Sequence, residues 1–197
     1  MNVVPPTSDG IGAAVEALRS GAIVAYPTET FYGLGVDPRN HEALALLFRV
    51  KRRGKDKPVL LVVDGAAQLE EVAIISGKAQ RFIDHFWPGP LSLLLPSKQK
   101  ETAYLSGADN KVCVRCPSCE TARVLCRQFG GPITSTSANI EGRPPARAIA
   151  ELDVPGIAVA IDGGVLAESP PSTVFDPETG CVLREGVIPE SALRMVG

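Results

Sequence analysis

The stretch VKRRGKDKPVLLVV (residues 50–63) joins a group of basic residues to a run of aliphatic ones. Upstream of it, Asn40 can cap a helix that extends to about residue 52, with apolar residues recurring on one side at helical spacing. Downstream, PVLLVV (58–63) is short and apolar and starts with a proline, which is typical of a buried strand. A helix leading through a short turn into a buried strand indicates an α/β fold.

Short apolar runs alternate with helical patterns along the rest of the chain. They predict strands at residues 22–26, 58–63, 91–95, 111–116, 132–137, 157–161, 172–176 and 181–185. They predict helices at about 9–20, 41–52, 76–87 and 119–129, with a short helix at the end. Residues 27–35 (PTETFYGLG) are expected to form a loop. Because strands are bracketed by helices early and closely spaced late, we expect one α/β domain over residues 1–197 with a mixed sheet.

Composition limits the function classes. Of 197 residues, 45% are hydrophobic and 21% are charged, as in ordinary globular proteins. The net charge of -2 argues against a surface built throughout for nucleic acid, although a local basic pocket is compatible with it. No signal-peptide pattern and no apolar run of ~20 residues is present, so we expect neither export nor a membrane span. The odd number of cysteines, five, favours reduced thiols and hence the cytoplasm.

The basic cluster near the opening stretch comprises Arg49, Lys51, Arg52, Arg53, Lys55 and Lys57. Cations at a helix C-terminus complement the helix dipole, and this explanation suffices for Arg49 and Arg52. Lys51, however, lies on the same stripe as the apolar residues of its helix and should point toward the sheet. Arg53 starts the turn into the buried strand. Inward cations need anions, so a phosphate or carboxylate ligand is expected here.

Two other stretches carry polar groups where apolar ones dominate. STSAN (Ser135 to Asn139) follows a strand, where ligands of open α/β sheets collect, but its residue types are equally suited to a turn and helix cap. Arg115 lies within the alternating strand KVCVRC, which predicts a paired or ligand-facing arginine. Arg184 repeats that situation, with Glu185 beside it as an alternative partner.

The cysteines suggest a metal site only weakly. Cys113, Cys116 and Cys119 have the C-x2-C-x2-C spacing of an iron–sulfur run, but Cys126 comes late for the fourth ligand. Strand alternation also places Cys113 and Cys116 on opposite faces. We interpret them as structural thiols, with a metal site as the minor alternative. The chain contains no GxxxxGK[ST] phosphate-binding motif.

Together these stretches resemble the YrdC-like threonylcarbamoyl-AMP synthase family, in its short single-domain form, over nearly the whole chain. The K-x-R and S-x-N signatures of that family fall on Lys51-x-Arg53 and Ser137-x-Asn139. The matching stretches, in order, are PTETFYGLG, KRRGKDKPV, FWPGPLSLLL, VCVRCP, STSANIEGRPP, DGG, PSTVFD and VLREGVI.

The resemblance implies a twisted mixed sheet with flanking helices and a concave, positively lined cavity. It implies that L-threonine, bicarbonate and ATP, with substrate-bound Mg²⁺, give threonylcarbamoyl-adenylate and pyrophosphate. Downstream threonylcarbamoyl-transferase proteins would then modify adenosine 37 of tRNA, and direct contact with tRNA is a further option. The implied threonine-binding residues are Thr30, Arg115 and Ser172; the ATP-binding residues are Arg53, Lys57, Ser135, Ser137, Asn139 and Arg184; the catalytic residues are Lys51, Arg53, Ser137 and Asn139.

The chain departs from the family pattern in several places. Gly54 replaces the usual proline, Pro171 replaces a frequent glutamate, and LREG replaces LRPG. REGV and PSTV are similar to a paralogue group of less certain activity. Two alternatives therefore stay open: a module that binds RNA or a nucleotide without synthase activity, and a carbamoyl-transfer domain like that of hydrogenase-maturation proteins.

Overall fold

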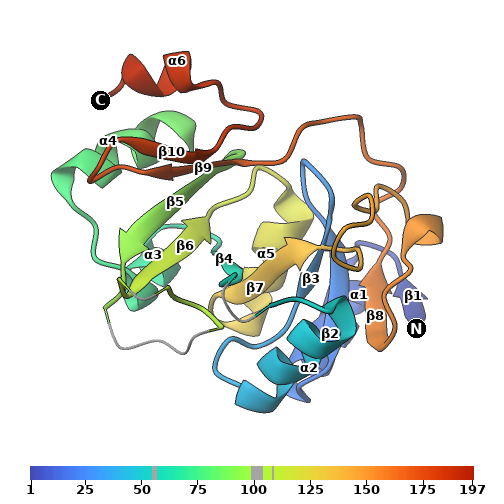
Figure 1. Cartoon of the computed structure of the whole chain (residues 1–197). Helices are drawn as coiled ribbons and strands as arrows, with labels where there is room; N and C mark the ends of the chain where they lie inside the picture. Colours follow the sequence, from blue (N-terminus) through green and yellow to red (C-terminus); the bar gives the residue numbers. More distant parts are fainter. Residues whose placement is uncertain (55–56, 99–103, 108) are drawn as a thin grey trace.

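Ten strands form one mixed sheet in the computed structural model, which describes residues 1–54, 57–98, 104–107 and 109–197 (Figure 1). Their order is β1-β8-β2-β3-β7-β4-β6-β5-β9-β10. The sheet contains both parallel pairs (β1/β8, β2/β8, β4/β6 and β5/β9) and antiparallel ones, which confirms the predicted mixed sheet. The strands are β1 (Asn2–Val4), β2 (Ile23–Pro27), β3 (Tyr32–Gly35), β4 (Leu60–Val62), β5 (Leu91–Pro96), β6 (Lys111–Arg115), β7 (Ile133–Ser137), β8 (Ile157–Ile161), β9 (Thr173–Asp176) and β10 (Cys181–Arg184).

Helices pack on both faces of this sheet (Figure 1). Helices α1 and α5 lie side by side against β1, β2 and β8, around a cluster that includes Leu18, Tyr26 and Leu125. A larger cluster joins α2, α3, α4 and α6 to residues of β2, β3, β4, β5, β6, β8 and β9. The helices are α1 (Ser8–Arg19), α2 (His41–Lys51), α3 (Ala66–Val72), α4 (Gly77–Phe86), α5 (Glu120–Phe129) and α6 (Glu190–Arg194), with a 3-10 turn at Ile149–Glu151.

The expectation of a loop over residues 27–35 is wrong for its second half. Residues 32–35 form β3, which is fully buried and pairs with both β2 and β7. The turn before it is closed by Thr28, whose hydroxyl donates to Phe31 O (2.7 Å) and accepts from Thr30 N (3.2 Å). Glycine is unfavourable inside strands, so the two glycines of YGLG did not indicate a strand at this position. Strand β1 and helix α3 were likewise not predicted.

Helix α2 positions the opening stretch. Asn40 caps it as predicted, because its side chain accepts from Glu42 N and Ala43 N. The helix ends at Lys51, and Arg52 adopts a left-handed conformation (φ 55°) that turns the chain sharply. Lys51 is buried and Arg49 and Arg52 are exposed, which confirms the division predicted from helical spacing.

Strand alternation gives the β5/β6/β9 part of the sheet one apolar and one polar face. Leu91, Leu93 and Leu95 of β5 join the core, whereas Ser92 and Leu94 face the other way. Phe175 of β9 likewise points into the core and Val174 away from it. The polar face therefore lies opposite α3 and α4, and it is where the main cavity forms.

Candidate functional site

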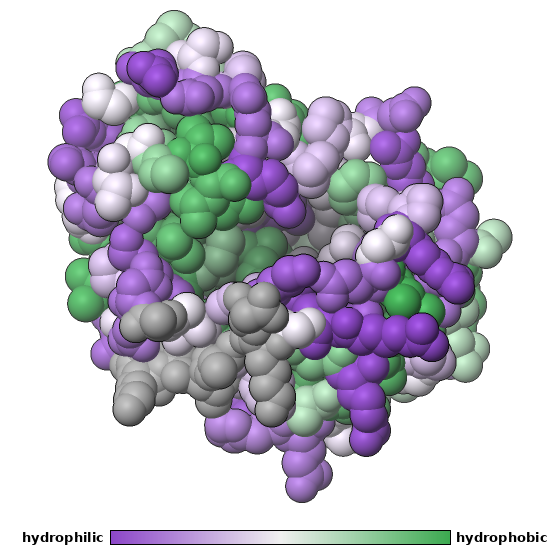
Figure 2. Space-filling view, viewed as in Figure 1, coloured by the Kyte–Doolittle hydropathy of each residue, from purple (hydrophilic) through white to green (hydrophobic). Residues whose placement is uncertain are grey.

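A cavity of about 770 Å³ lies over the polar face of β5, β6, β7 and β9. Four cations line it, namely Arg53, Lys111, Arg115 and Arg184, together with the carboxylate of Asp109. Apolar side chains, including Leu94, Val174 and Leu183, form one wall. Figure 2 shows this face hollowed near its centre, with apolar surface on one side of the hollow and hydrophilic surface on the other. An anionic ligand with an apolar part fits this lining.

Three polar residues that are distant in sequence line the same cavity. Thr30 (4% exposed), Arg115 (3%) and Ser172 (4%) all line it, from the β2–β3 turn, the end of β6 and the start of β9. Thr30 Oγ1 lies 3.1 Å from Thr28 Oγ1, which holds its hydroxyl in place. An arginine and two fixed hydroxyls are the donors that recognise the carboxylate of an amino acid. We call these three residues the carboxylate end.

Arg184 lies at the carboxylate end as well. Its guanidinium donates to Ser172 O (2.8 Å and 3.1 Å) and to Ser172 Oγ (3.1 Å). Burial, with the charge of Arg115 nearby, lowers the pKa of Arg184. Ser92, which is fully buried, lies 2.9 Å from Ser172 Oγ and completes this group. Ser92 was missed from the sequence, although a lone serine alternating with leucines in LSLLL is a signal for a strand face that turns away from the core.

Arg53 and the strand β7 hydroxyls of Ser135 and Ser137 form a second donor set in the lining of the same cavity. Arg53 donates from Nε to Lys57 O (2.7 Å) and from Nη2 to Pro58 O (2.9 Å), and its guanidinium lies over the Phe48 ring, 5.8 Å from its centroid. These contacts fix the arginine at the cavity edge. A cation beside two hydroxyls suits a phosphate group, so we call these three residues the phosphate end.

Lys51 and Asn139 support the phosphate end without lining it. Lys51 Nζ donates to Ser137 O, to Asn139 O (2.5 Å) and to Asn139 Oδ1 (3.4 Å). Asn139 in turn donates to Arg143 O (2.5 Å) and accepts from Ser137 Oγ (2.5 Å). Burial, followed by the charge of Arg53, lowers the pKa of Lys51 to about 8. The ammonium thus ties the STSAN segment to the end of α2.

Lys51 lies outside the cavity lining, and its expected contact with a phosphate stays a prediction. A buried ammonium must donate hydrogen bonds to nearby acceptors, and the carbonyl oxygens of Ser137 and Asn139 accept them. Lys57, expected to contact ATP, also lies outside the cavity lining: its Nζ donates to Glu141 Oε1 at 2.5 Å. Lys55 and part of the 97–110 loop (residues 99–103 and 108) fall outside the described residues.

The cysteine cluster divides between two faces, as predicted. Cys113 lines the cavity, whereas Cys116 joins the core. Burial raises the pKa of Cys113 to about 12 and that of Cys116 to about 11, so both thiols stay protonated at neutral pH. Within the described ranges, no group of three or more His, Cys, Asp or Glu side chains could hold a metal ion. None of the helices built from described residues is long and apolar enough to cross a membrane.

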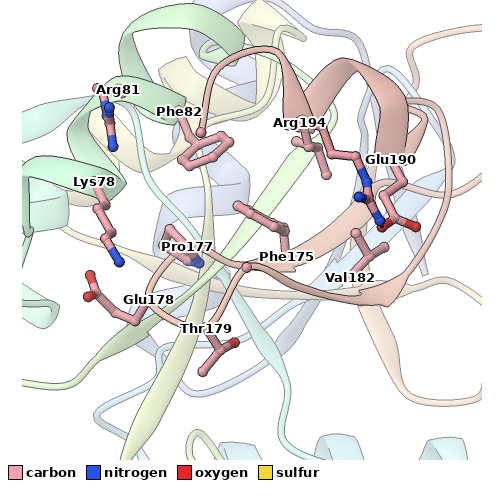
Figure 3. A pocket seen from close by; sticks show the side chains of 13 residues that line it. Lys78, Arg81, Phe82, Phe175, Pro177, Glu178, Thr179, Val182, Glu190 and Arg194 are labelled. Atoms are coloured by element: carbon pink, nitrogen blue, oxygen red, sulfur yellow. Dashed lines mark hydrogen bonds and ion pairs between the residues drawn. The ribbon is translucent and has the colours of Figure 1, made fainter.

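A second pocket, of about 560 Å³, lies on the other face of β9 and β10. Phe82 and Phe175 point into it, with Lys78 and Arg81 of α4 on one side and the Glu190–Arg194 pair of α6 on the other (Figure 3). Its cations lie at the rim and its floor is apolar. Among the described lining residues of this second pocket there is no group of buried hydrogen-bond donors like that of the first cavity. The first cavity is therefore the candidate site.

Comparison with known proteins agrees with this geometry. The Sua5/YciO/YrdC family model, described as "Telomere recombination", matches residues 16–186. The chain is 37% identical over 191 residues to a threonylcarbamoyl-AMP synthase of Xanthomonas campestris, covering 92% of this chain and 100% of that protein. It is 39% identical to the synthase of Chromohalobacter salexigens, covering 90% of this chain and 98% of the relative.

One of the similar solved structures contains a bound amino acid. The crystal structure of P. abyssi Sua5 complexed with L-threonine superimposes with a TM-score of 0.90 at 33% identity and covers 99% of this chain. The chain spans 59% of the length of that Sua5 protein.

Proposed function

The chain belongs to the Sua5/YciO/YrdC family, and we propose that its cavity makes threonylcarbamoyl-adenylate and pyrophosphate from L-threonine, bicarbonate and ATP. The protein is on this basis a nucleotidyltransferase, a threonylcarbamoyl-AMP synthase like its curated relatives. The proposal rests on one observation: two sets of hydrogen-bond donors line the same cavity. Thr30, Arg115 and Ser172 suit an amino acid carboxylate, while Arg53 and the β7 hydroxyls suit phosphates.

The carboxylate end is proposed to bind L-threonine. Arg115 would form a forked pair with the substrate carboxylate, which a lysine could not match. Thr30 and Ser172 would fix the rest of the amino acid through their hydroxyls. A Sua5 structure of the same fold binds L-threonine, which supports this assignment. The amine nitrogen would then form a bond to the carbon of carbon dioxide, whose C=O π electrons move onto an oxygen as the amine loses a proton. With bicarbonate, a C–O bond would break instead and the hydroxide would leave with the amine proton as water. Either route gives a carbamate.

The phosphate end is proposed to bind ATP. Arg53, Ser135 and Ser137 would contact the triphosphate, with Arg184 reaching it from the carboxylate end. A carbamate oxygen would bond to the α-phosphorus while the bond to the β-phosphate oxygen breaks and pyrophosphate leaves with its charge. Most of the rate enhancement would come from positioning and from cations placed where charge develops. Lys51, Lys57 and Asn139 would act by holding this end in shape.

Mg²⁺ is proposed to arrive with the triphosphate. The cavity residues supply one lining carboxylate, Asp109, and several hydroxyls, a donor set that suits an ion already held mainly by phosphate oxygens. Bound in this way, the ion would neutralise charge on the departing pyrophosphate.

Pyrophosphate release is the test of this function. The purified protein should release pyrophosphate only when ATP, L-threonine and bicarbonate are all present. Arg53→Ala and Ser137→Ala should abolish that release while the circular dichroism spectrum stays unchanged. Salt-sensitive tRNA binding without pyrophosphate release would instead support the RNA-binding alternative. ATP turnover that depends on carbamoyl phosphate would support the carbamoyl-transfer alternative.

The reactivity of the product indicates which kind of reaction must consume it. A carbamoyl–phosphate mixed anhydride is a reactive acyl donor, so a threonylcarbamoyl-transferase acting on tRNA is proposed to consume it. All five cysteines are free thiols, which supports the cytoplasm as the compartment. Whether the synthase itself contacts tRNA is tested by the same binding measurement.

A further inference from the structure

Glu29 is a buried carboxylate with no assigned role. It lies in the β2–β3 turn between Thr28 and Thr30, and its side chain is 17% exposed. Both of its oxygens are shielded from solvent, and neither accepts a hydrogen bond from the described residues. Its ion-pair partner is Arg115, whose Nη1 lies 3.9 Å from Glu29 Oε1. Burying a carboxylate without hydrogen bonds destabilises the folded protein unless a nearby opposite charge compensates for it.

Arg115 differs from the other cations of the cavity. Arg53 donates to backbone carbonyls, Arg184 to Ser172, and Lys111 to Asp176 at 2.6 Å. Arg115 is 3% exposed, its buried Nε has no acceptor in the described part of the chain, and its one charged neighbour in ion-pair range is Glu29. The arginine therefore keeps its N–H groups available while Glu29 balances its charge.

We propose that Glu29 is the positioning residue for Arg115 and thereby sets the affinity of the carboxylate end for L-threonine. Thr28, Thr30 and Phe31 of the same turn line the cavity, but Glu29 does not. It therefore approaches Arg115 from behind rather than from the substrate side. At 3.9 Å it attracts the guanidinium without using up the N–H groups that a substrate carboxylate needs.

The inference rests on the proposed function and has a competing physical outcome. Glu29 also repels a substrate carboxylate, so its removal could in principle strengthen threonine binding. Orientation should prevail, because a buried arginine that loses its partner turns toward other acceptors. The sign of the change in threonine affinity therefore decides between positioning and simple repulsion.

The experiment is Glu29→Gln, which keeps the size of the side chain and removes its charge. We expect the KM for L-threonine to rise about tenfold, the effect of losing an outer carboxylate at metal sites, while kcat and the KM for ATP change less than twofold. Glu29→Asp, which keeps the charge, should lose less. Calorimetric titration of L-threonine without ATP should show the same loss of affinity as the KM.

Controls separate this role from general damage. Glu168→Gln makes the same chemical change at a side chain that is 93% exposed, and it should leave every constant unchanged. In an Arg115→Ala background, Glu29→Gln should add no further loss, because the two residues act through one contact. If Glu29 only stabilised the fold, Glu29→Gln would raise the KM for L-threonine and the KM for ATP alike, and it would lower the melting temperature.

Two results would overturn the inference: an unchanged or lower KM for L-threonine in Glu29→Gln, or equal increases for threonine and ATP. The ¹⁵N–¹H signal of Arg115 Nε gives a readout that does not require catalysis. It should broaden or move in Glu29→Gln, and an unaltered signal would also count against the proposal. Failure of the proposed function would appear differently, as absent pyrophosphate release by the unaltered protein.

Discussion

Arg115 is buried, yet its N–H groups can still bind a substrate carboxylate. Its strand places it on the cavity face, and its neighbours leave its N–H groups without acceptors among the described residues. We predict that Arg115→Lys raises the KM for L-threonine at least tenfold, because an ammonium cannot form a forked pair with a carboxylate. The KM for ATP should stay within twofold. Steady-state pyrophosphate release measures both constants, and equal effects on the two substrates would contradict the assignment.

Lys51 gives a second prediction, on protonation. Its pKa, lowered by burial to about 8 from 10.5, should appear as a ¹⁵N signal of the ammonium that titrates near pH 8, apart from the surface lysines. Because the folded protein binds fewer protons than the unfolded one between these values, the contribution of Lys51 to stability should rise with pH across that window. Comparison with Lys51→Met by urea unfolding at pH 7.5 and pH 9.5 checks the sign. A Lys51 signal titrating near 10.5 would contradict the prediction.

At the scale of elements, α2 connects the core to the phosphate end. Its cap fixes where it begins, and Lys51 at its last turn holds the STSAN segment. We predict that Asn40→Ala lowers the free energy of unfolding by about 1 kcal/mol, because two helix N–H groups lose their acceptor. Asn40→Asp, which keeps an acceptor, should lose less. Urea unfolding measures both, and equal losses would show that the cap is not the cause.

The segment after β10 gives a prediction that links an element to the site. A Cβ on Gly186 would lie 2.0 Å from Pro171 O, beside Ser172. Gly186→Ala must therefore push the 171–172 backbone away from its place at the carboxylate end. We expect a higher KM for L-threonine and a lower melting temperature. Gly12→Ala is the matched control, because a Cβ there meets nothing within 4 Å. It should leave the KM unchanged and raise the melting temperature slightly, because Gly12 lies inside helix α1, where alanine is favoured over glycine.

Elements could be predicted where one periodicity dominates. Helix α2 was found from its cap and apolar stripe, and β6 from its alternation. Strand β3 was missed because its pairing with β2 and β7 outweighs the low strand propensity of its glycines. Strand β1 was missed because Asn2–Val4 is short and gains its stability from β8, which lies far away in sequence.

At the scale of the whole molecule, the sequence indicated which residues matter better than how they act. Helical spacing correctly turned Lys51 inward, but its acceptors on Ser137 and Asn139 depend on a contact across 86 to 88 residues. Glu29 escaped notice because its ion-pair partner Arg115 lies in β6, far away in sequence. Long-range contacts of this kind cannot be deduced from local patterns.

The two donor sets of the cavity should also be distinguishable in solution. A ligand that binds only the folded protein stabilises it by about 2.7 kcal/mol at one hundred times its Kd, which for a chain of this size corresponds to a rise in melting temperature of about 5 to 11 °C. We predict that ATP with Mg²⁺ and L-threonine each produce such a rise.

Substitutions should remove these shifts selectively, because the two donor sets that line the cavity share no residue. Arg115→Ala should abolish the shift caused by L-threonine and keep that caused by ATP, and Arg53→Ala should do the reverse. Each variant is compared with its own ligand-free melting temperature, so that a loss of intrinsic stability cancels. If either substitution removed both shifts, the cavity would behave as one undivided site, and the separate carboxylate and phosphate ends would have to be abandoned.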